Sequence, residues 1–324
     1  MVIFAGWLFG TLFFLLGEYV PRAKFRSFAL TSLVRSLVLV AGLTVGMLLI
    51  MPVAVSLSMH KPIWDSQVRG ALQYVTVYMV PIWVGIGLVM ALVVTSVFRI
   101  NEKLGPGVLF KWITGKYHNP KEEERIFMFL DLKNSTTLAE KLGNLRFSSL
   151  CQDFFRDLSR PVQSTNGEVS HYIGDEAVLS WIPKNGLDQA NCLRCFYYMQ
   201  WAIDQRREHY LREYGVVPEF KAGVHMGLVV ASEVGEVKSE IVYHGDVLNT
   251  TARITGLCSE LQSDLLVSGD LAQRITLPPG TKARSLGPRL LKGKEHEVEI
   301  VAIDKEGGSS PVAIYNAERA EVRA

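Results

Sequence analysis

The chain has 324 residues, with 34 Lys and Arg against 32 Asp and Glu and a net charge of +2 at pH 7. This near-balance, without a basic stripe interleaved with aromatic residues, argues against a nucleic-acid partner. Four cysteines are too few to form a disulfide framework in a chain of this length. The length allows two domains, and the charge is uneven, because residues 1–98 hold only a handful of charged side chains.

Residues 1–98 contain three apolar segments that are typical of a membrane region. Residues 2–17 are short for a span, residues 36–58 are long enough, and residues 71–98 are longer, with Pro81 as a tolerated kink. Basic residues in the first loop and after the third segment predict that the N-terminus lies outside and the C-terminal domain in the cytoplasm. We therefore expect an all-α, multi-pass region of about three helices in the lipid bilayer of the cell (inner) membrane, or four if one segment spans twice.

The remaining chain divides into a linker at residues 99–124, a domain at residues 125–303 and a flexible tail at residues 304–324. The linker is polar and interrupted by glycine and proline, and residues 121–125 are interpreted as a solvated lead-in to the first strand. The domain alternates strands and helices without long parallel βαβ units, which predicts an α+β sheet covered by helices. Among its expected elements are a hairpin of strands at 167–173 and 176–182, an amphipathic helix at 187–214 and a helix at 246–258.

A run of large apolar residues from Ile126 predicts a buried strand that ends at Asp131. A carboxylate at the end of a buried strand is costly unless a positive group meets it there. The next helix opens at Asn134, Ser135 and Thr136, and its free N–H groups suit a phosphate in the same corner. A carboxylate that faces phosphates implies a divalent metal ion between them.

A second carboxylate, Asp175, follows Gly174 at the tip of the predicted hairpin. If this hairpin lies beside the first strand, Asp131 and Asp175 converge. Two such carboxylates can hold two Mg²⁺ or Mn²⁺ ions, which is the arrangement used for in-line attack on phosphorus. Either aspartate alone is weak evidence, because a single turn aspartate is usually structural.

Four segments, in matching order and spacing, resemble the motifs of the class III nucleotidyl (adenylate and guanylate) cyclases. Residues 129–136 resemble the first metal motif and residues 172–176 the second. Residues 245–253 resemble the ribose and transition-state helix, and residues 291–294 the triphosphate-binding turn. The likeness covers about residues 125–303 and implies the class III catalytic fold, with a ferredoxin-like βαββαβ core.

The resemblance implies roles for particular residues. Asp131 and Asp175 resemble the ligands of two Mg²⁺ or Mn²⁺ ions per active site, helped by the backbone carbonyl of Leu132. The family places its sites at a head-to-tail homodimer interface, with these aspartates from one chain and the remaining groups from its partner. The sequence itself shows no dimer.

The remaining groups are one amide and two cations. Asn249 resembles the residue that orients the ribose, Arg253 the residue that stabilises charge on the α-phosphate, and Lys292 the lysine that pairs with the triphosphate. The spacing of Asn249 and Arg253 supports this assignment independently, because positions i and i+4 share one face of a helix. The alternative is a surface lysine and a helix pair that only caps or bridges.

The positions that read the purine depart from the family pattern. His171 stands where a lysine is common in adenylyl cyclases, and Val242 stands where Asp, Thr or Ser is usual. Tyr243 is a further candidate for a base contact through its backbone. His171 is alternatively a strand residue that packs at the interface. Asn134 replaces a frequent glycine, and asparagine tolerates the left-handed conformation that the glycine adopts.

The favoured function is a membrane-anchored adenylate cyclase that converts ATP to 3′,5′-cyclic AMP and pyrophosphate. The alternatives are a guanylate cyclase and a cyclase-like nucleotide-binding signalling module with little turnover. A diguanylate cyclase is disfavoured, because residues 173–177 lack the paired glycines and terminal Phe of that family.

Overall fold

The computed structural model describes residues 40–42, 44, 48, 50–105 and 107–306. The chain divides into two compact units, Met1–Leu109 and Phe110–Ala324. The predicted span at residues 2–17, much of the one at 36–58 and most of the predicted tail lie outside the described residues. Each unit is therefore considered by itself.

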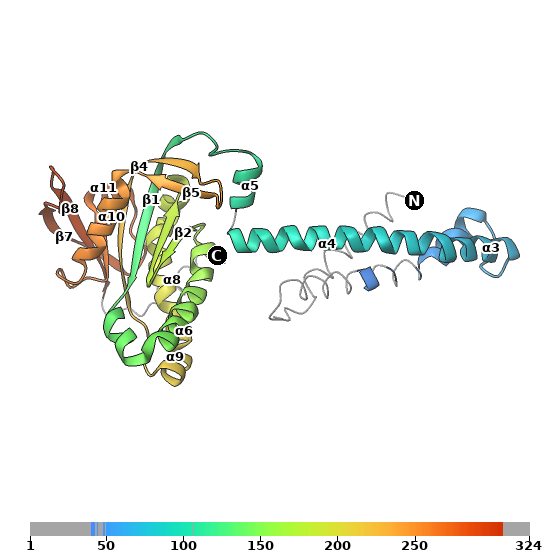
Figure 1. The fold of residues 1–324 in the computed structure, drawn as a ribbon, viewed down its shortest axis with the longest axis horizontal. Coiled ribbons are helices and arrows are strands. Elements are labelled where there is room, and N and C mark those ends of the chain that lie inside the picture. The colour runs from blue at the N-terminus through green and yellow to red at the C-terminus, as the bar shows by residue number, and fades with distance from the viewer. Residues whose placement is uncertain (1–39, 43, 45–47, 49, 106, 307–324) are drawn as a thin grey trace. The chain divides into compact units, whose positions relative to one another are not determined.

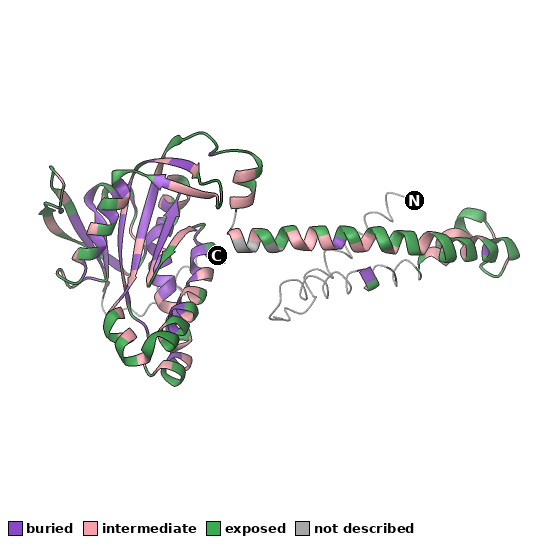
Figure 2. Ribbon diagram, viewed as in Figure 1, coloured by how far each residue is buried: buried purple, intermediate pink, exposed green. Residues whose placement is uncertain are grey.

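The first unit contains a long apolar helix built from three consecutive elements: α3 (Ser66–Tyr74), a π-helical turn η1 (Val75–Met79) and α4 (Val80–Leu104). The π-turn lies just before Pro81, where the missing N–H and the ring disturb α-helical hydrogen bonding. Ser66–Phe98 has a mean hydropathy of 2.4 and is, among the described residues, the helix long and apolar enough to cross a membrane. Most of its side chains are exposed or half-buried (Figure 2). The expectation of about three spans stays a prediction.

The second unit is built on one mixed sheet of eight strands. Their order is β2-β3-β1-β4-β6-β8-β7, with β5 paired to β4 (Figure 1). Pairing is antiparallel except between β4 and β6. The strands are β1 (Lys121–Leu132), β2 (Glu168–Ile173), β3 (Glu176–Trp181), β4 (Phe220–Val234), β5 (Glu240–His244), β6 (Leu265–Ser268), β7 (Thr281–Arg289) and β8 (Val298–Lys305).

The first four strands and the helices between them form the predicted βαββαβ core, with β1 and β4 at the centre of the sheet. The predicted helix at 187–214 is interrupted at Arg206. Part of the predicted linker at 99–124 is helical. The helices are α5 (Val108–Ile113), α6 (Ser135–Ser164), α7 (Pro183–Leu187), α8 (Asn191–Gln205), α9 (Arg207–Tyr214), α10 (Asp246–Leu257) and α11 (Gly269–Arg274), with a 3₁₀ turn at Asp188–Ala190.

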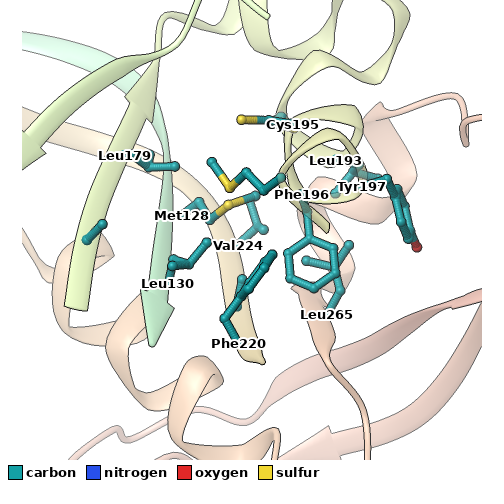
Figure 3. Close-up of a cluster of buried hydrophobic side chains, with 14 of the residues drawn as sticks. Met128, Leu130, Leu179, Leu193, Cys195, Phe196, Tyr197, Phe220, Val224 and Leu265 are labelled. Carbon is teal, nitrogen blue, oxygen red and sulfur yellow. The ribbon is translucent and has the colours of Figure 1, made fainter. Parts of the chain in front are cut away.

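Alternation along β1 divides the core into two faces. Met128 and Leu130 face α6 and α8, where they pack with Phe196 and Phe220 (Figure 3). Phe127 points to the opposite face and packs in a second cluster that contains residues of β5 and α10. The sheet is therefore covered on both faces, which explains the nearly continuous apolar run that predicted this strand.

The predicted solvated lead-in at residues 121–125 is only partly confirmed, because Lys121 and Glu122 are exposed but the whole segment belongs to the strand. β1 already begins at Lys121, and the Arg125 side chain is 1% exposed. Its guanidinium group lies between the carboxylates of Glu123 and Glu168, at 2.7 and 3.0 Å. These partners compensate for the loss of water, so a charged residue is tolerated in the core.

Helix α10 lies directly on β4 because Gly223 carries no side chain. A Cβ atom at Gly223 would approach the backbone nitrogen of Thr255 to 2.5 Å. Thr255 also donates a hydrogen bond of 3.3 Å to the carbonyl of Phe129 on β1. This close contact sets the height of α10 above the two central strands.

We expect Gly223→Ala to destabilise the protein by about 1–3 kcal/mol, because α10 must move away from β4 to admit the methyl group. The matched control is Gly256→Ala on α10 itself, where no atom lies within 4 Å of the added Cβ. That substitution should be neutral or stabilising by up to about 1 kcal/mol, since alanine favours helix. Urea unfolding of both variants measures the difference, and equal effects would contradict the close packing.

Candidate active site

Asp131 lies near the end of β1, between the two strands that pair with it. Its direct partners are Glu176 on β3 and Lys221 on β4, so the three side chains share one face of the sheet. The Lys221 ammonium group is 3.1 Å from Oδ2 of Asp131. The carboxylate expected to need a positive partner therefore has one within the chain.

The hairpin between β2 and β3 brings Asp175 to the same corner. Gly174 supplies the left-handed conformation of the turn, with φ of 64°, which confirms the predicted hairpin. Burial raises the pKa of Glu176, and the negative charges of Asp131 and Asp175 raise it further. Glu176 therefore lies close to both predicted aspartates: it pairs directly with Asp131 and directly follows Asp175 in the chain.

The start of α6 completes this corner. Asn134 adopts the left-handed conformation attributed to it, with φ of 56° and ψ of 28°. Ser135 and Thr136 follow as the first residues of the helix, whose initial N–H groups have no partner within the helix. Leu132 as a whole is 2% exposed and packs in the hydrophobic core, so its part in a metal site, through the backbone carbonyl, stays a prediction.

A second group of predicted residues gathers around α10. Asn249 is exposed and Arg253 half-buried, one turn apart on the helix. The turn between β7 and β8 carries Lys292, and a Cβ added at the next residue, Gly293, would lie 3.4 Å from Nη2 of Arg253. Within the described part of the chain, the side chains of Asn249, Arg253 and Lys292 make no hydrogen bond or ion pair, either with Asp131 and Asp175 or with other residues.

The predicted base-contacting residues lie on β2 and β5. His171 Nδ1 and the Ser170 hydroxyl form a 2.8 Å hydrogen bond, and the tautomer of His171 decides which of them donates. Lys238, and to a smaller extent His171, lowers the pKa of Glu240 at the start of β5. The Tyr243 ring is buried against Phe127, which leaves its backbone for any contact with a ligand.

The carboxylate corner fits a magnesium-type ion in one specific way. In the described residues, no three His, Cys, Asp or Glu side chains are arranged to hold one ion together. Mg²⁺ is commonly held by one or two carboxylates together with substrate phosphates, and it keeps several waters. Asp131, Asp175 and the carbonyl of Leu132 match that sparse ligand set.

Glu176 and Lys221 were missed at the sequence level. Glu176 directly follows Asp175, and this adjacency was the available signal. Lys221 lies 90 positions from Asp131 in the chain, and only the pairing register of β1 with β4 brings the two together.

We expect Glu176→Gln to raise the melting temperature of the metal-free protein at neutral pH by about 1–3 °C, because it removes a repelled carboxylate. Because the pKa of Glu176 is raised in the folded state, its ionised form lowers the stability of the protein above that pKa. Below the usual value of 4.5 the carboxyl is protonated in both states, and the loss of stability vanishes. The gain should therefore disappear in acid. Glu260→Gln, at an exposed site, is the control, and a Glu176→Gln gain that persists in acid would contradict the repulsion.

Comparison with known proteins identifies the family of this domain. The family model of the adenylate and guanylate cyclase catalytic domain matches residues 118–304. Adenylate cyclase 2 of Rhizobium meliloti (strain 1021) is 37% identical over 207 residues, which cover 64% of this chain and 57% of that protein. An adenylate cyclase of Anabaena cylindrica is 23% identical over 184 residues, covering 54% of this chain and 36% of that protein.

Two solved structures share the fold. A bacterial light-regulated adenylyl cyclase matches with a TM-score of 0.57 at 21% identity, over 72% of this chain and 68% of that one. The adenylyl cyclase CyaB from P. aeruginosa matches with a TM-score of 0.50 at 17% identity, over 59% of this chain and 98% of that one. The chain spans little more than half of the Rhizobium protein, and the candidate site lies within the residues that the family model matches. The chain therefore belongs to the family of adenylate and guanylate cyclase catalytic domains.

Proposed function

We propose that the protein is an adenylate cyclase, which converts ATP to 3′,5′-cyclic AMP and pyrophosphate. The observation that carries this proposal is the pairing of Asp131 with Glu176, the residue next to Asp175, at the end of β1 from which the chain continues into α6. The similarity to bacterial adenylate cyclases favours ATP over GTP as the substrate. The reaction class is an internal attack of the ribose 3′-hydroxyl on the α-phosphorus.

In this proposal, Asp131 and Asp175, with the carbonyl of Leu132, hold two Mg²⁺ or Mn²⁺ ions. Such ions, when bound, make the 3′-hydroxyl a better nucleophile and neutralise phosphate charge. The free N–H groups at Asn134, Ser135 and Thr136 bind phosphate oxygens at the positive end of the helix. These groups bind and orient the triphosphate so that the attacking and leaving oxygens are in line.

The groups around α10 act on the rest of the nucleotide. Asn249 orients the ribose through its amide, Arg253 stabilises the charge that develops on the α-phosphate, and Lys292 pairs with the triphosphate. Neither Arg253 nor Lys292 forms an ion pair within 4 Å in the described part of the chain, and the carboxylate of Asp246, which interacts with Arg253 electrostatically, is paired with Lys294. The positive charges of Arg253 and Lys292 are thus available to a ligand.

We infer that a second copy of the chain completes each site. In the described part of the chain, no hydrogen bond or ion pair joins the side chains of the two groups, and Asn249 and Lys292 are exposed. In a head-to-tail homodimer, the carboxylate corner of one protomer would face α10 of its partner. A C2 dimer of this kind has two equivalent sites.

We further propose that the protein is anchored in the cell membrane with its catalytic domain in the cytoplasm. The domain boundaries in this proposal are a membrane region at 1–98, a linker at 99–124, the catalytic domain at 125–303 and a tail at 304–324. Support comes from Ser66–Phe98, whose exposed apolar side chains suit lipid rather than water.

The direct test incubates membranes that contain the full chain with ATP or GTP and Mn²⁺, and measures cyclic nucleotide. We expect cyclic AMP from the parent chain and a loss of about 10³-fold or more in Arg253→Ala, because the developing charge is no longer met. The control is Arg160→Ala, an exposed arginine of α6 whose loss should leave the rate unchanged.

Absence of any cyclic product from a folded, dimeric parent chain would contradict the proposal. Cyclic GMP in preference to cyclic AMP would retain the reaction and overturn the assignment of ATP. Nucleotide binding without product would instead support a signalling module that binds but does not turn over.

A further inference from the structure

In the described part of the chain, Arg125 is the one charged residue that is fully buried. Its Nε donates to Glu123 at 2.7 Å, and its Nη1 donates to Glu168 at 3.0 Å and to Ser180 at 3.1 Å. A buried charge is retained only where partners satisfy it, and loss of one partner leaves the other uncompensated. The position of this guanidinium group is therefore tightly determined.

Arg125 connects two strands that do not pair in the sheet. Glu168 belongs to β2, which pairs only with β3, whereas Tyr243 belongs to β5, which pairs only with β4. The guanidinium carbon lies 4.8 Å from the centre of the Tyr243 ring, within the range of a cation–π interaction. One side chain of β1 thus joins the two outlying strands.

These two strands carry the candidate base-contacting residues. Val242 is adjacent to Tyr243 on β5, and His171 follows Glu168 by three positions on β2. Three positions would normally place His171 and Glu168 on opposite faces, but the register of β2 shifts between Val169 and His171. The bulge returns His171 to the face of Arg125, opposite Val178 of β3.

The segment before β1 reinforces the same connection. Lys111 donates to both carboxylate oxygens of Glu168 at 2.8 Å. The Tyr117 hydroxyl donates to Glu123 at 2.9 Å, and its side chain is 2% exposed. Each of the two carboxylates that bind Arg125 therefore has a second hydrogen-bond donor.

We propose that Arg125 is a positioning residue for purine selection, which acts by fixing β2 and β5, and with them His171 and Val242, at the separation that the purine edge requires. This inference rests on the proposed nucleotide-binding function. Selectivity between two purines is the difference between their binding affinities. This difference becomes smaller when the polar groups that contact the purine are displaced. Lysine cannot replace Arg125, because it lacks the planar fork that reaches several partners and stacks on the ring.

The experiment compares three variants of the full-length protein in detergent. Arg125→Lys removes the planar guanidinium group. Glu168→Gln weakens the contacts of β2 with Arg125 and leaves the contact of Arg125 with Tyr243 in place. The control is Arg206→Lys, since Arg206 also pairs with a carboxylate, Asp157, at 2.6 Å and lies over a tyrosine ring, Tyr210. This control cluster joins α6 to α9 on the other face of the sheet.

The readout is competition of 3′-deoxy-ATP and 3′-deoxy-GTP against a fluorescent ATP analogue, in the presence of Mn²⁺. Neither deoxynucleotide has the attacking hydroxyl, so selectivity is measured without turnover. We expect the ratio of the two dissociation constants to change by about fivefold or more in Arg125→Lys, and in the same direction in Glu168→Gln. Arg206→Lys should lower the melting temperature and leave the ratio unchanged.

An unchanged ratio in Arg125→Lys and Glu168→Gln, with only a lower melting temperature, would overturn the inference and leave a structural ion cluster. If Arg125→Lys does not fold, Glu168→Gln alone decides by the same criterion. A parent chain that binds neither nucleotide would overturn the proposed function and the inference together. A parent that binds selectively but forms no cyclic product would overturn the catalytic proposal alone.

Discussion

The pairing of β1 between β3 and β4 is the constraint on which the candidate site depends. One face of β1 is covered by α6 and α8, and the other presents Arg125, Phe127, Phe129 and Asp131 in alternation. Arg125 and Asp131 are six residues apart, or about 20 Å along an extended strand. A single strand therefore places the carboxylate corner at one end and the support of the base-contacting strands at the other. Movement of β1 relative to its neighbours would disturb both.

Much of the fold was predictable because its signals are local. The apolar run from Ile126 predicted β1, Gly174 predicted the hairpin turn, and Asn134 adopts the left-handed conformation that its side chain tolerates. The βαββαβ core and the gathering of Arg253 with the turn of Lys292 followed from a resemblance in several motifs at once. Each of these inferences needed only neighbouring residues or motif order.

Other features depend on register and burial, which a single sequence does not specify. Lys221 reaches Asp131 through the pairing of β1 with β4, and His171 reaches the face of Glu168 through a bulge in β2. A solvated Arg125 was expected because it ends a run of charged residues, yet besides its neighbour Glu123 its partners lie on β2, β3 and β5. In each case contacts between distant segments determine where the side chain lies, and the local composition gave no signal or a misleading one.

The central claim is that each active site takes its carboxylates from one chain and its Asn249, Arg253 and Lys292 from another. The most direct test isolates heterodimers of an Asp131→Ala chain and an Arg253→Ala chain by two different affinity tags. Each variant alone should be inactive, and the heterodimer should regain about half of the parent activity, because one of its two sites keeps every group. An inactive heterodimer, folded and of the correct composition, would contradict the account.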